Sequence, residues 1–305
     1  MATRMRWMRF RPQEAALIAI TAVWGSTFLL VHWAMEHADP WFFVGIRFLV
    51  AGLISVAIFW RSLRGMRWRD IGAGAAIGVM IYLGYGLQTL GLQTIDSSTS
   101  AFITAMYVPL VPLAQWAVFR KRPPTMAFVG AGLAFVGLML IAGPDAFALT
   151  LGTGEIATMI STLPIAAEII LISVFAGKVD LGRITIVQLL TAGLLGLLTM
   201  PVAGEAVPEF SWVWVGAAVG LGAASCLIQL TMNWAQKSVS PTRATIIYAG
   251  EPVWAGVIGR IAGERLPATA LIGGGLVVLG ILASELKLVR RKSRAVEEQP
   301  SERGR

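Results

Sequence analysis

Ten apolar segments divide this chain, each roughly the 20 residues that a helix needs to cross the ~30 Å hydrocarbon core of a bilayer. They lie at about 14–35, 41–60, 70–93, 98–119, 125–142, 155–176, 184–203, 211–235, 243–261 and 267–287. Hydrophobic residues make up 56% of the 305 residues and charged residues only 14%, less charge than a soluble domain carries. We therefore predict an all-α integral membrane protein with ten transmembrane helices.

Both ends of the chain are polar. Residues 1–13 are basic and resemble the first region of a signal peptide, but the apolar segment that follows is too long for a signal core and lacks a clear cleavage site. We interpret that segment as a retained first helix. Residues 288–305 are charged and predict a disordered tail.

The positions of the positive charges predict the orientation. With the N-terminus in the cytoplasm and each segment crossing once, the cytoplasmic stretches hold most of the Arg and Lys residues, in agreement with the positive-inside rule. These residues are Arg4, Arg6, Arg9, Arg11, Arg61, Arg64, Arg67, Arg69, Arg120, Lys121, Arg122, Lys178, Arg183, Lys237 and Arg243. Both termini are therefore predicted to be cytoplasmic.

Several partners and cofactors are excluded by the same sequence. The net charge of +8 comes from short clusters between apolar segments, which does not favour nucleic acid as a partner. Cys226 is the single cysteine, so no intrachain disulfide is possible, and with only His32 and His37 beside it we expect no metal site. No phosphate-binding loop of an ATP-driven pump is present, and we expect no cofactor.

The chain contains an internal repeat. Gln93 and Gln236 lie 143 residues apart, and Pro109 and Pro252 share that offset, as do Gly residues at 130, 132 and 137 with those at 273, 275 and 280. Chance matches between apolar, Gly-rich helices are common, but shared Gln and Pro in one register are not. The units are residues 14–142 and 155–287. Each holds five helices, an odd number, so we predict two inverted repeats, as in many transporters.

Polar side chains form stripes on four of the predicted helices. In each stripe they fall within roughly a 100° arc. The stripes include Tyr82, Tyr85, Thr89 and Gln93 on helix three, Tyr107 on helix four, Gln229 and Asn233 on helix eight, and Tyr248 and Glu251 on helix nine. Because these helices are repeat-related pairs, we predict one shared cavity. For any single residue, interhelical hydrogen bonding is the alternative.

Three ionisable residues, Arg47, Glu168 and Glu251, lie well inside predicted helices. Such residues are costly in a bilayer and are functional candidates by default. Glu168 is a candidate to hold a substrate ammonium group or to take a proton. Glu251 precedes Pro252, so a structural or gating role competes with ligand contact. Trp24 lies deep in the first helix, where stacking on an apolar solute and simple packing are both open.

The chain resembles the EamA-type members of the drug/metabolite transporter superfamily over about residues 14–285. The shared motifs are Trp24-Gly25-Ser26-Thr27-Phe28, Arg47, Gly91-Leu92-Gln93 and, most specifically, Glu251-Pro252-Val253 with Ala255, Gly259, Gly263-Glu264-Arg265-Leu266, Gly273, Gly275 and Gly280. The resemblance implies a ten-helix protein of a bacterial-type inner (plasma) membrane. It also implies export of aromatic and other apolar amino acids, or similar metabolites, by alternating access. Arg120-Lys121-Arg122 departs from the family, which often has an acidic residue after helix four.

We accordingly predict a secondary transporter, not an enzyme, whose partners are a small-molecule substrate and the lipid bilayer. A carrier of drugs or other metabolites with the same fold is one alternative, and a channel or a membrane-embedded enzyme is another. No catalytic set is evident, and the oligomeric state is left open. The predicted substrate-binding residues are Trp24, Tyr82, Tyr85, Thr89, Gln93, Tyr107, Glu168, Gln229, Asn233, Tyr248 and Glu251.

Overall fold

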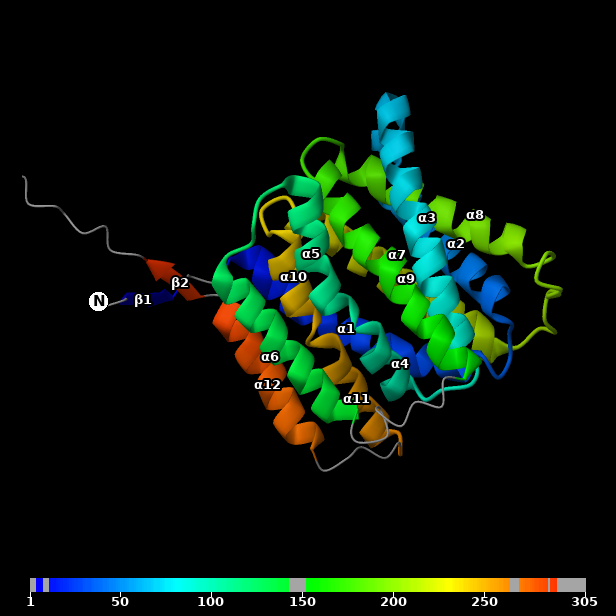
Figure 1. Ribbon diagram of the computed structural model, residues 1–305. Helices are drawn as coiled ribbons and strands as arrows, with labels where there is room; N and C mark the ends of the chain where they lie inside the picture. Colours follow the sequence, from blue (N-terminus) through cyan, green and yellow to red (C-terminus); the bar gives the residue numbers. More distant parts are fainter. Residues whose placement is uncertain (1–3, 8–10, 143–151, 264–268, 285, 290–305) are drawn as a thin grey trace, which may run out of the picture.

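A computed structural model describes residues 4–7, 11–142, 152–263, 269–284 and 286–289. The first half of the chain forms α1 (Pro12–Ala34), α2 (Pro40–Phe59), a 3₁₀ turn (Trp60–Gly65), α3 (Trp68–Gly91), α4 (Ser97–Thr104), α5 (Tyr107–Phe119) and α6 (Thr125–Ala142). The second half forms α7 (Thr153–Phe175), α8 (Leu181–Thr199), α9 (Trp212–Ala235), α10 (Pro241–Tyr248), α11 (Glu251–Ile261) and α12 (Ala270–Ser284). Figure 1 shows these helices as one bundle.

The predicted membrane architecture is confirmed. With α4–α5 and α10–α11 each counted as one broken helix, the described residues form ten helices. Seven stretches are long and apolar enough to cross a membrane, among them Ser97–Phe119, which covers α4 and α5 together. The apolar parts of α6 and α12, Thr125–Leu140 and Ile272–Ala283, are shorter.

Two predicted segments, 98–119 and 243–261, are not continuous helices. The first breaks between Thr104 and Tyr107, and the second between Tyr248 and Glu251. Proline has no N–H to donate, and its ring clashes with the carbonyl group four residues earlier. Pro109 and Pro252 each lie just after a break, so they account for both interruptions. The two breaks fall at equivalent positions of the internal repeat.

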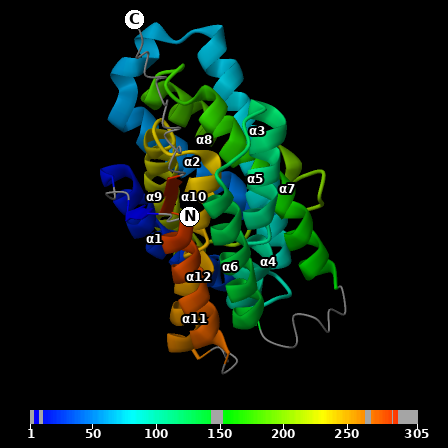
Figure 2. The ribbon, with the colours of Figure 1, turned by 60° about the vertical axis from the view of Figure 1, so that its left-hand side comes forward.

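The two halves pack against each other along much of their length. α6 packs on α12, α2 on α8, and α3 on α7 and α8, and Figures 1 and 2 both show α6 and α12 side by side. Glycine permits the close approach of α6 and α12. A Cβ atom at Gly137 would lie 2.5 Å from the carbonyl oxygen of Gly273, and one at Gly280 would lie 2.6 Å from that of Gly130.

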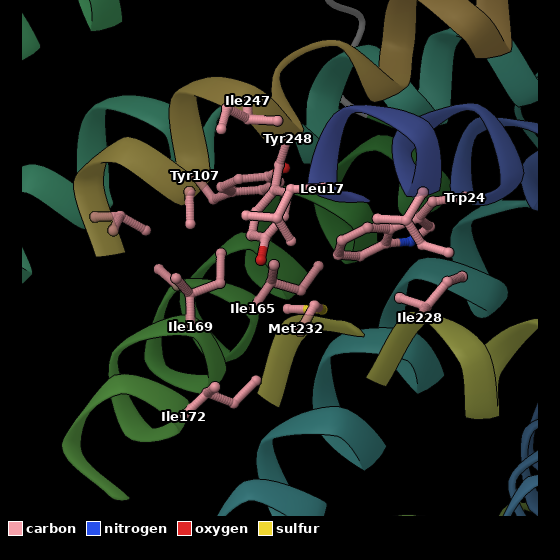
Figure 3. Close-up of a cluster of buried hydrophobic side chains, with 14 of the residues drawn as sticks. Leu17, Trp24, Tyr107, Ile165, Ile169, Ile172, Ile228, Met232, Ile247 and Tyr248 are labelled. Atoms are coloured by element: carbon pink, nitrogen blue, oxygen red, sulfur yellow. The ribbon is translucent and has the colours of Figure 1, made fainter. Parts of the chain in front are cut away.

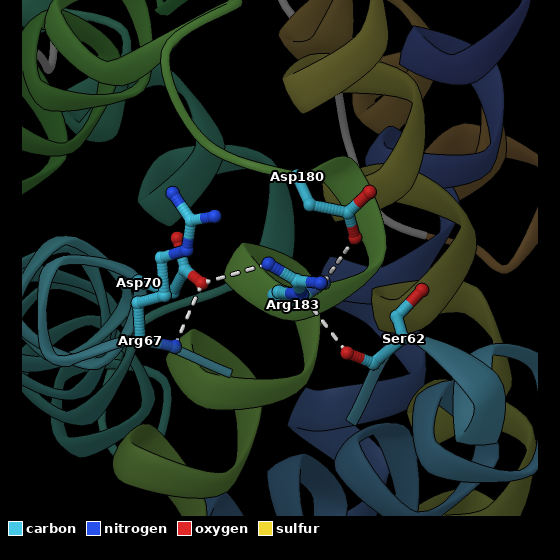
Figure 4. Close-up of polar contacts among 5 residues, drawn as sticks. All are labelled: Ser62, Arg67, Asp70, Asp180 and Arg183. Carbon is cyan, nitrogen blue, oxygen red and sulfur yellow. Dashed lines mark hydrogen bonds and ion pairs between the residues drawn. The ribbon is translucent and has the colours of Figure 1, made fainter. Parts of the chain in front are cut away.

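One end of the bundle, which we call the basic end, holds the chain segments 60–67, 120–124, 176–180 and 236–240 with their Arg and Lys residues. An ion pair joins the two halves there. Arg183 Nη1 on α8 lies 3.2 Å from Asp70 Oδ2 on α3. Arg183 Nε also donates to the carbonyl group of Ser62, as Figure 4 shows. A second ion pair, 2.7 Å long, joins Arg243 on α10 to Glu14 on α1.

The chain ends contain a short sheet. β1 (Arg4–Trp7) pairs antiparallel with β2 (Leu286–Val289), and Arg4 lies opposite Val289. Leu288 and Val289, the first residues of the predicted disordered tail, are therefore in a strand. The rest of that predicted tail lies outside the described residues.

Candidate functional site

A cluster of aromatic side chains occupies the middle of the bundle. Trp24 on α1 stacks on Tyr85 of α3, with ring centroids 6.4 Å apart, and meets the ring of Tyr248 edge-on at 5.6 Å. Tyr85 also packs edge-on against Phe48 of α2 at 5.1 Å. Tyr107 of α5 belongs to the same core (Figure 3), and both Tyr107 and Tyr248 are fully buried. Five helices thus bring aromatic rings to one place.

Three ionisable side chains border these rings. Glu168 on α7, Glu251 on α11 and Arg47 on α2 have exposed fractions of 0%, 2% and 2%. The Arg47 guanidinium carbon lies 5.4 Å from the centre of the Tyr85 ring, and its Nε donates to the Ser225 hydroxyl at 2.8 Å. Both carboxylates lie within electrostatic range of Tyr85 and of each other. The cluster therefore combines aromatic faces with acidic and basic side chains.

Several polar atoms of this cluster have no hydrogen-bond partner among the described residues. They are both carboxylate oxygens of Glu251, Glu168 Oε2, Arg47 Nη2 and the Tyr107 hydroxyl. Tyr107 lies beside Glu251 but lacks the geometry of a hydrogen bond to it. Buried polar groups in native proteins are nearly always paired, so unpaired ones call for an explanation. Five of the eight buried side-chain polar atoms without a partner among the described residues lie in this cluster, as expected of a site for a polar ligand.

A chain of side-chain hydrogen bonds leads away from Glu168. Gln229 of α9 donates to Glu168 Oε1 at 2.7 Å, and Gln188 of α8 donates to Gln229 at 2.8 Å. Asn233 of α9 donates both to Gln188, at 3.2 Å, and to the Thr185 hydroxyl, at 3.0 Å. All five residues are buried. This chain of hydrogen bonds holds one oxygen of Glu168 in place and leaves the other unpaired.

Most of the predicted substrate-binding residues meet in or beside this cluster. The residues that meet there are Trp24, Tyr85, Tyr107, Glu168, Gln229, Tyr248 and Glu251. Asn233 belongs to the hydrogen-bond chain rather than to the aromatic cluster. Thr89 is buried on α3, one turn beyond Tyr85.

Two of the predicted residues lie elsewhere. The Tyr82 hydroxyl shares a 2.6 Å hydrogen bond with Thr199 of α8, and its ring packs on Trp41 at 5.2 Å. Tyr82 and Tyr85 differ by only about 60° around α3, because three residues turn a helix by about 300°, but their rings have different neighbours. Gln93 is exposed, because α3 ends at Gly91 and Gln93 lies in the following turn. The predicted stripe on helix three therefore does not form one surface.

Sequence reasoning missed other residues of this region. Phe48 contacts Tyr85, and Gln188 and Thr185 extend the hydrogen-bond chain, yet none was among the predicted substrate-binding residues. Gln188 had a detectable signal, because it is a polar residue in the middle of an apolar segment. Phe48 had none, since it is one of 13 phenylalanines in an apolar chain.

The fold and the buried cluster together define a class of protein. Two inverted halves that enclose a polar site within the bundle are the architecture of membrane carriers. The sequence profile of the EamA-like transporter family matches residues 13–143 and 152–285, one match in each half. The chain therefore belongs to the EamA-like transporter family; it is a multi-pass membrane transporter and not an enzyme.

Known relatives support this assignment without naming a substrate. An uncharacterized transporter of Archaeoglobus fulgidus is 27% identical over 279 residues, which cover 90% of this chain and 86% of the relative. The uncharacterized inner membrane transporter YedA of Escherichia coli K12 is 27% identical over 299 residues, covering 91% and 92%. A solved crystal structure aligns with a TM-score of 0.72 over 89% of this chain and 96% of the other, at 16% identity, which shows the fold alone.

Proposed function

We propose that this transporter exports amino acids with aromatic or other apolar side chains across a bacterial-type inner membrane, from a cytoplasm that contains both chain termini. In this proposal the substrate occupies the central cluster between the two repeats. In alternating access, the cluster would open first to one side of the membrane and then to the other, and this would carry the substrate across.

The observation that carries the proposal is the set of unpaired polar atoms around the aromatic rings. A free amino acid has a carboxylate, an ammonium group and a side chain, and each matches part of this set. Arg47 offers an unpaired guanidinium nitrogen for the carboxylate, and Glu168 and Glu251 offer unpaired oxygens for the ammonium group. Trp24, with its neighbouring rings, offers apolar and π surface to an aromatic or aliphatic side chain.

The breaks in the two repeat-related helices support the alternating-access part of the proposal. Tyr107 begins α5 directly after the first break, and Tyr248 ends α10 directly before the second. Both are in the central cluster. Bending at Pro109 and Pro252 would therefore move site residues together with the helix halves that carry them.

Uptake into proteoliposomes tests the proposal. Purified protein is reconstituted and offered a panel of radiolabelled amino acids, with and without a pH gradient. Saturable movement of aromatic or aliphatic amino acids is expected, and stimulation by the gradient would reveal proton coupling. If demonstrably folded protein moves no amino acid, the amino-acid proposal falls and a carrier of drugs or other metabolites becomes the leading alternative. Flux that rises linearly with concentration would indicate a channel.

A further inference from the structure

A pocket of about 510 Å³ opens at the basic end of the bundle, outside the central cluster. Its lining includes Gln115 and Lys121 from the first half of the chain and Ser173, Gln236, Lys237 and Ser238 from the second. Lys121, Lys237 and Ser238 are exposed, whereas Gln236 is buried. The pocket thus has two ammonium groups near its surface and amide and hydroxyl groups below them.

One lining residue connects this pocket to the central cluster. Gln236 accepts a 2.7 Å hydrogen bond from the Ser173 hydroxyl and donates a 3.2 Å hydrogen bond to the Tyr248 hydroxyl. Tyr248 in turn meets the ring of Trp24. A single buried amide therefore separates the pocket from the aromatic rings, and a ligand in the pocket would lie next to the central site.

The pocket lies between the two halves. Gln115 on α5 accepts hydrogen bonds from the backbone N–H and the hydroxyl of Thr242 on α10, each 2.9 Å long. Because the first and second halves both contribute walls, a relative movement of the halves would change the shape of the pocket. This is the location expected of an entrance that opens and closes with the transport cycle.

We propose that this pocket is the entrance subsite at the basic end, where Lys121 and Lys237 bind the substrate's carboxylate and Gln236 controls access to the central cluster. The inference rests on the proposed function, because it takes an amino acid as the substrate. Lysine ammonium groups bind carboxylates by charge-assisted hydrogen bonds. The phosphate of an anionic lipid is the competing ligand for such a pair, but the amide link to Tyr248 favours a solute that continues inward.

Cysteine labelling tests the subsite independently of transport. In the Ser238→Cys variant, a membrane-impermeant thiol reagent should label the pocket, while the native Cys226 is buried and serves as the background measured in wild type. L-Phenylalanine and N-acetyl-L-phenylalanine should both slow labelling because both carry a carboxylate. L-Phenylalaninamide, which lacks the carboxylate, should not. N-Acetyl-L-phenylalanine has no ammonium group for Glu168 and Glu251, so its protection reports the pocket alone.

The lysines are tested in the same background. Replacing both by Lys121→Ala and Lys237→Ala should raise the concentration of N-acetyl-L-phenylalanine needed for protection about tenfold, a change within the range for losing charged contacts. The control is Lys178→Ala, which removes an exposed lysine from the same end but outside the pocket lining and should leave protection unchanged. Protection in the unaltered pocket should also weaken as salt is added.

Three outcomes would count against the inference. Equal protection by the amide, or no effect of the two lysine substitutions, would overturn the assignment of a carboxylate subsite. Labelling that responds to the anionic lipid content of the vesicles, and not to the added compounds, would assign the pocket to a lipid phosphate. If wild-type protein moves no amino acid in proteoliposomes, the proposed function fails on that measurement, and the labelling result still reports what the pocket binds.

Discussion

Glu168 on α7 is held by Gln229 on α9, whose amide nitrogen lies 2.7 Å from one carboxylate oxygen. Gln188 repeats this relationship one step further along, since it donates to Gln229 at 2.8 Å. Each amide in the chain thus donates toward the carboxylate. Hydrogen bonds arranged in this way polarise one another, and their effects on stability are not independent. The orientation of Glu168 therefore depends on residues that do not touch it.

We therefore predict that substitutions in this hydrogen-bond chain have non-additive effects on the free energy of unfolding. Gln229→Ala and Gln188→Ala should each destabilise the protein, and the double variant should differ from their sum by at least about 0.5 kcal/mol, as residues of one network do. The free energy of unfolding in detergent micelles is the measurement. As a control, Gln115→Ala, whose hydrogen bonds go to Thr242, should combine additively with Gln229→Ala. An additive result for Gln229 and Gln188 would contradict the network.

The ion pair between Asp70 and Arg183 should contribute to the association of the two halves. Asp70 is 7% exposed at its side chain, so Asp70→Asn leaves Arg183 without its buried partner and should cost about 1–3 kcal/mol. The charge reversal Asp70→Arg with Arg183→Asp should recover part of that loss. Asp180→Asn is the matched control, because Asp180 caps α8 by accepting from the Arg183 backbone, a role that Asn performs equally well. Equal melting temperatures for Asp70→Asn and Asp180→Asn would contradict the assigned role.

The glycine positions on α6 and α12 should differ sharply in how well they tolerate a larger side chain. Gly137→Val and Gly280→Val would force side-chain atoms into the backbone of the facing helix and should destabilise the bundle by more than about 2 kcal/mol. Gly132→Val and Gly275→Val are matched controls, because an added Cβ there meets no atom within 4 Å. Size-exclusion profiles and melting temperatures in detergent check the prediction. Loss of folded protein in the control variants would show that these glycines are needed for another reason.

From the environment of Glu205 we predict that the stability of the protein depends on pH. This residue follows α8 and accepts hydrogen bonds from the backbone N–H groups of Trp41 and Phe42, at 3.1 and 2.9 Å. Partial burial raises the pKa of Glu205 above its ordinary value, despite these hydrogen bonds, which lower it. A carboxyl group with a raised pKa stabilises the fold while protonated, and this contribution is lost as the pH rises through the folded-state pKa.

Glu205→Gln removes that titration and keeps a carbonyl acceptor. The melting temperatures of wild type and variant should therefore be close near pH 4 and should diverge, with wild type falling relative to the variant, as the pH rises. A difference that is the same at every pH, or one that grows as the pH falls, would contradict the raised pKa.

Much of the fold was predictable from the sequence because the bilayer imposes a simple length rule on apolar segments. The ten segments and the duplication both follow from patterns along the chain. The helix breaks were harder to predict from the sequence. Pro109 and Pro252 were visible, but proline near the start of a helix is also common, so the sequence alone does not separate a new helix from a kink.

The sequence predicted the chemical character of the site better than it predicted which residues form it. Glu168, Glu251 and Tyr248 are polar residues at membrane depth, and the cost of burying them marks them from the sequence alone. Gln93 was assigned to the same surface because the end of α3 at Gly91 is not fixed by periodicity, and helix ends vary by one or two residues. Gln188 and Phe48 join the region through tertiary packing, which a helical arc drawn on one segment does not capture.

Counterflow of radiolabelled L-phenylalanine in proteoliposomes tests whether the aromatic and carboxylate cluster is the substrate site. Wild type should show saturable counterflow, and Glu168→Gln and Glu251→Gln should each reduce it at least tenfold while folding and inserting normally, a loss of about 1.4 kcal/mol or more. Gln93→Ala, outside the cluster, should keep the wild-type rate. Wild-type counterflow in both glutamate variants, or an equal loss of counterflow in all three variants, would rule out the cluster as the substrate site.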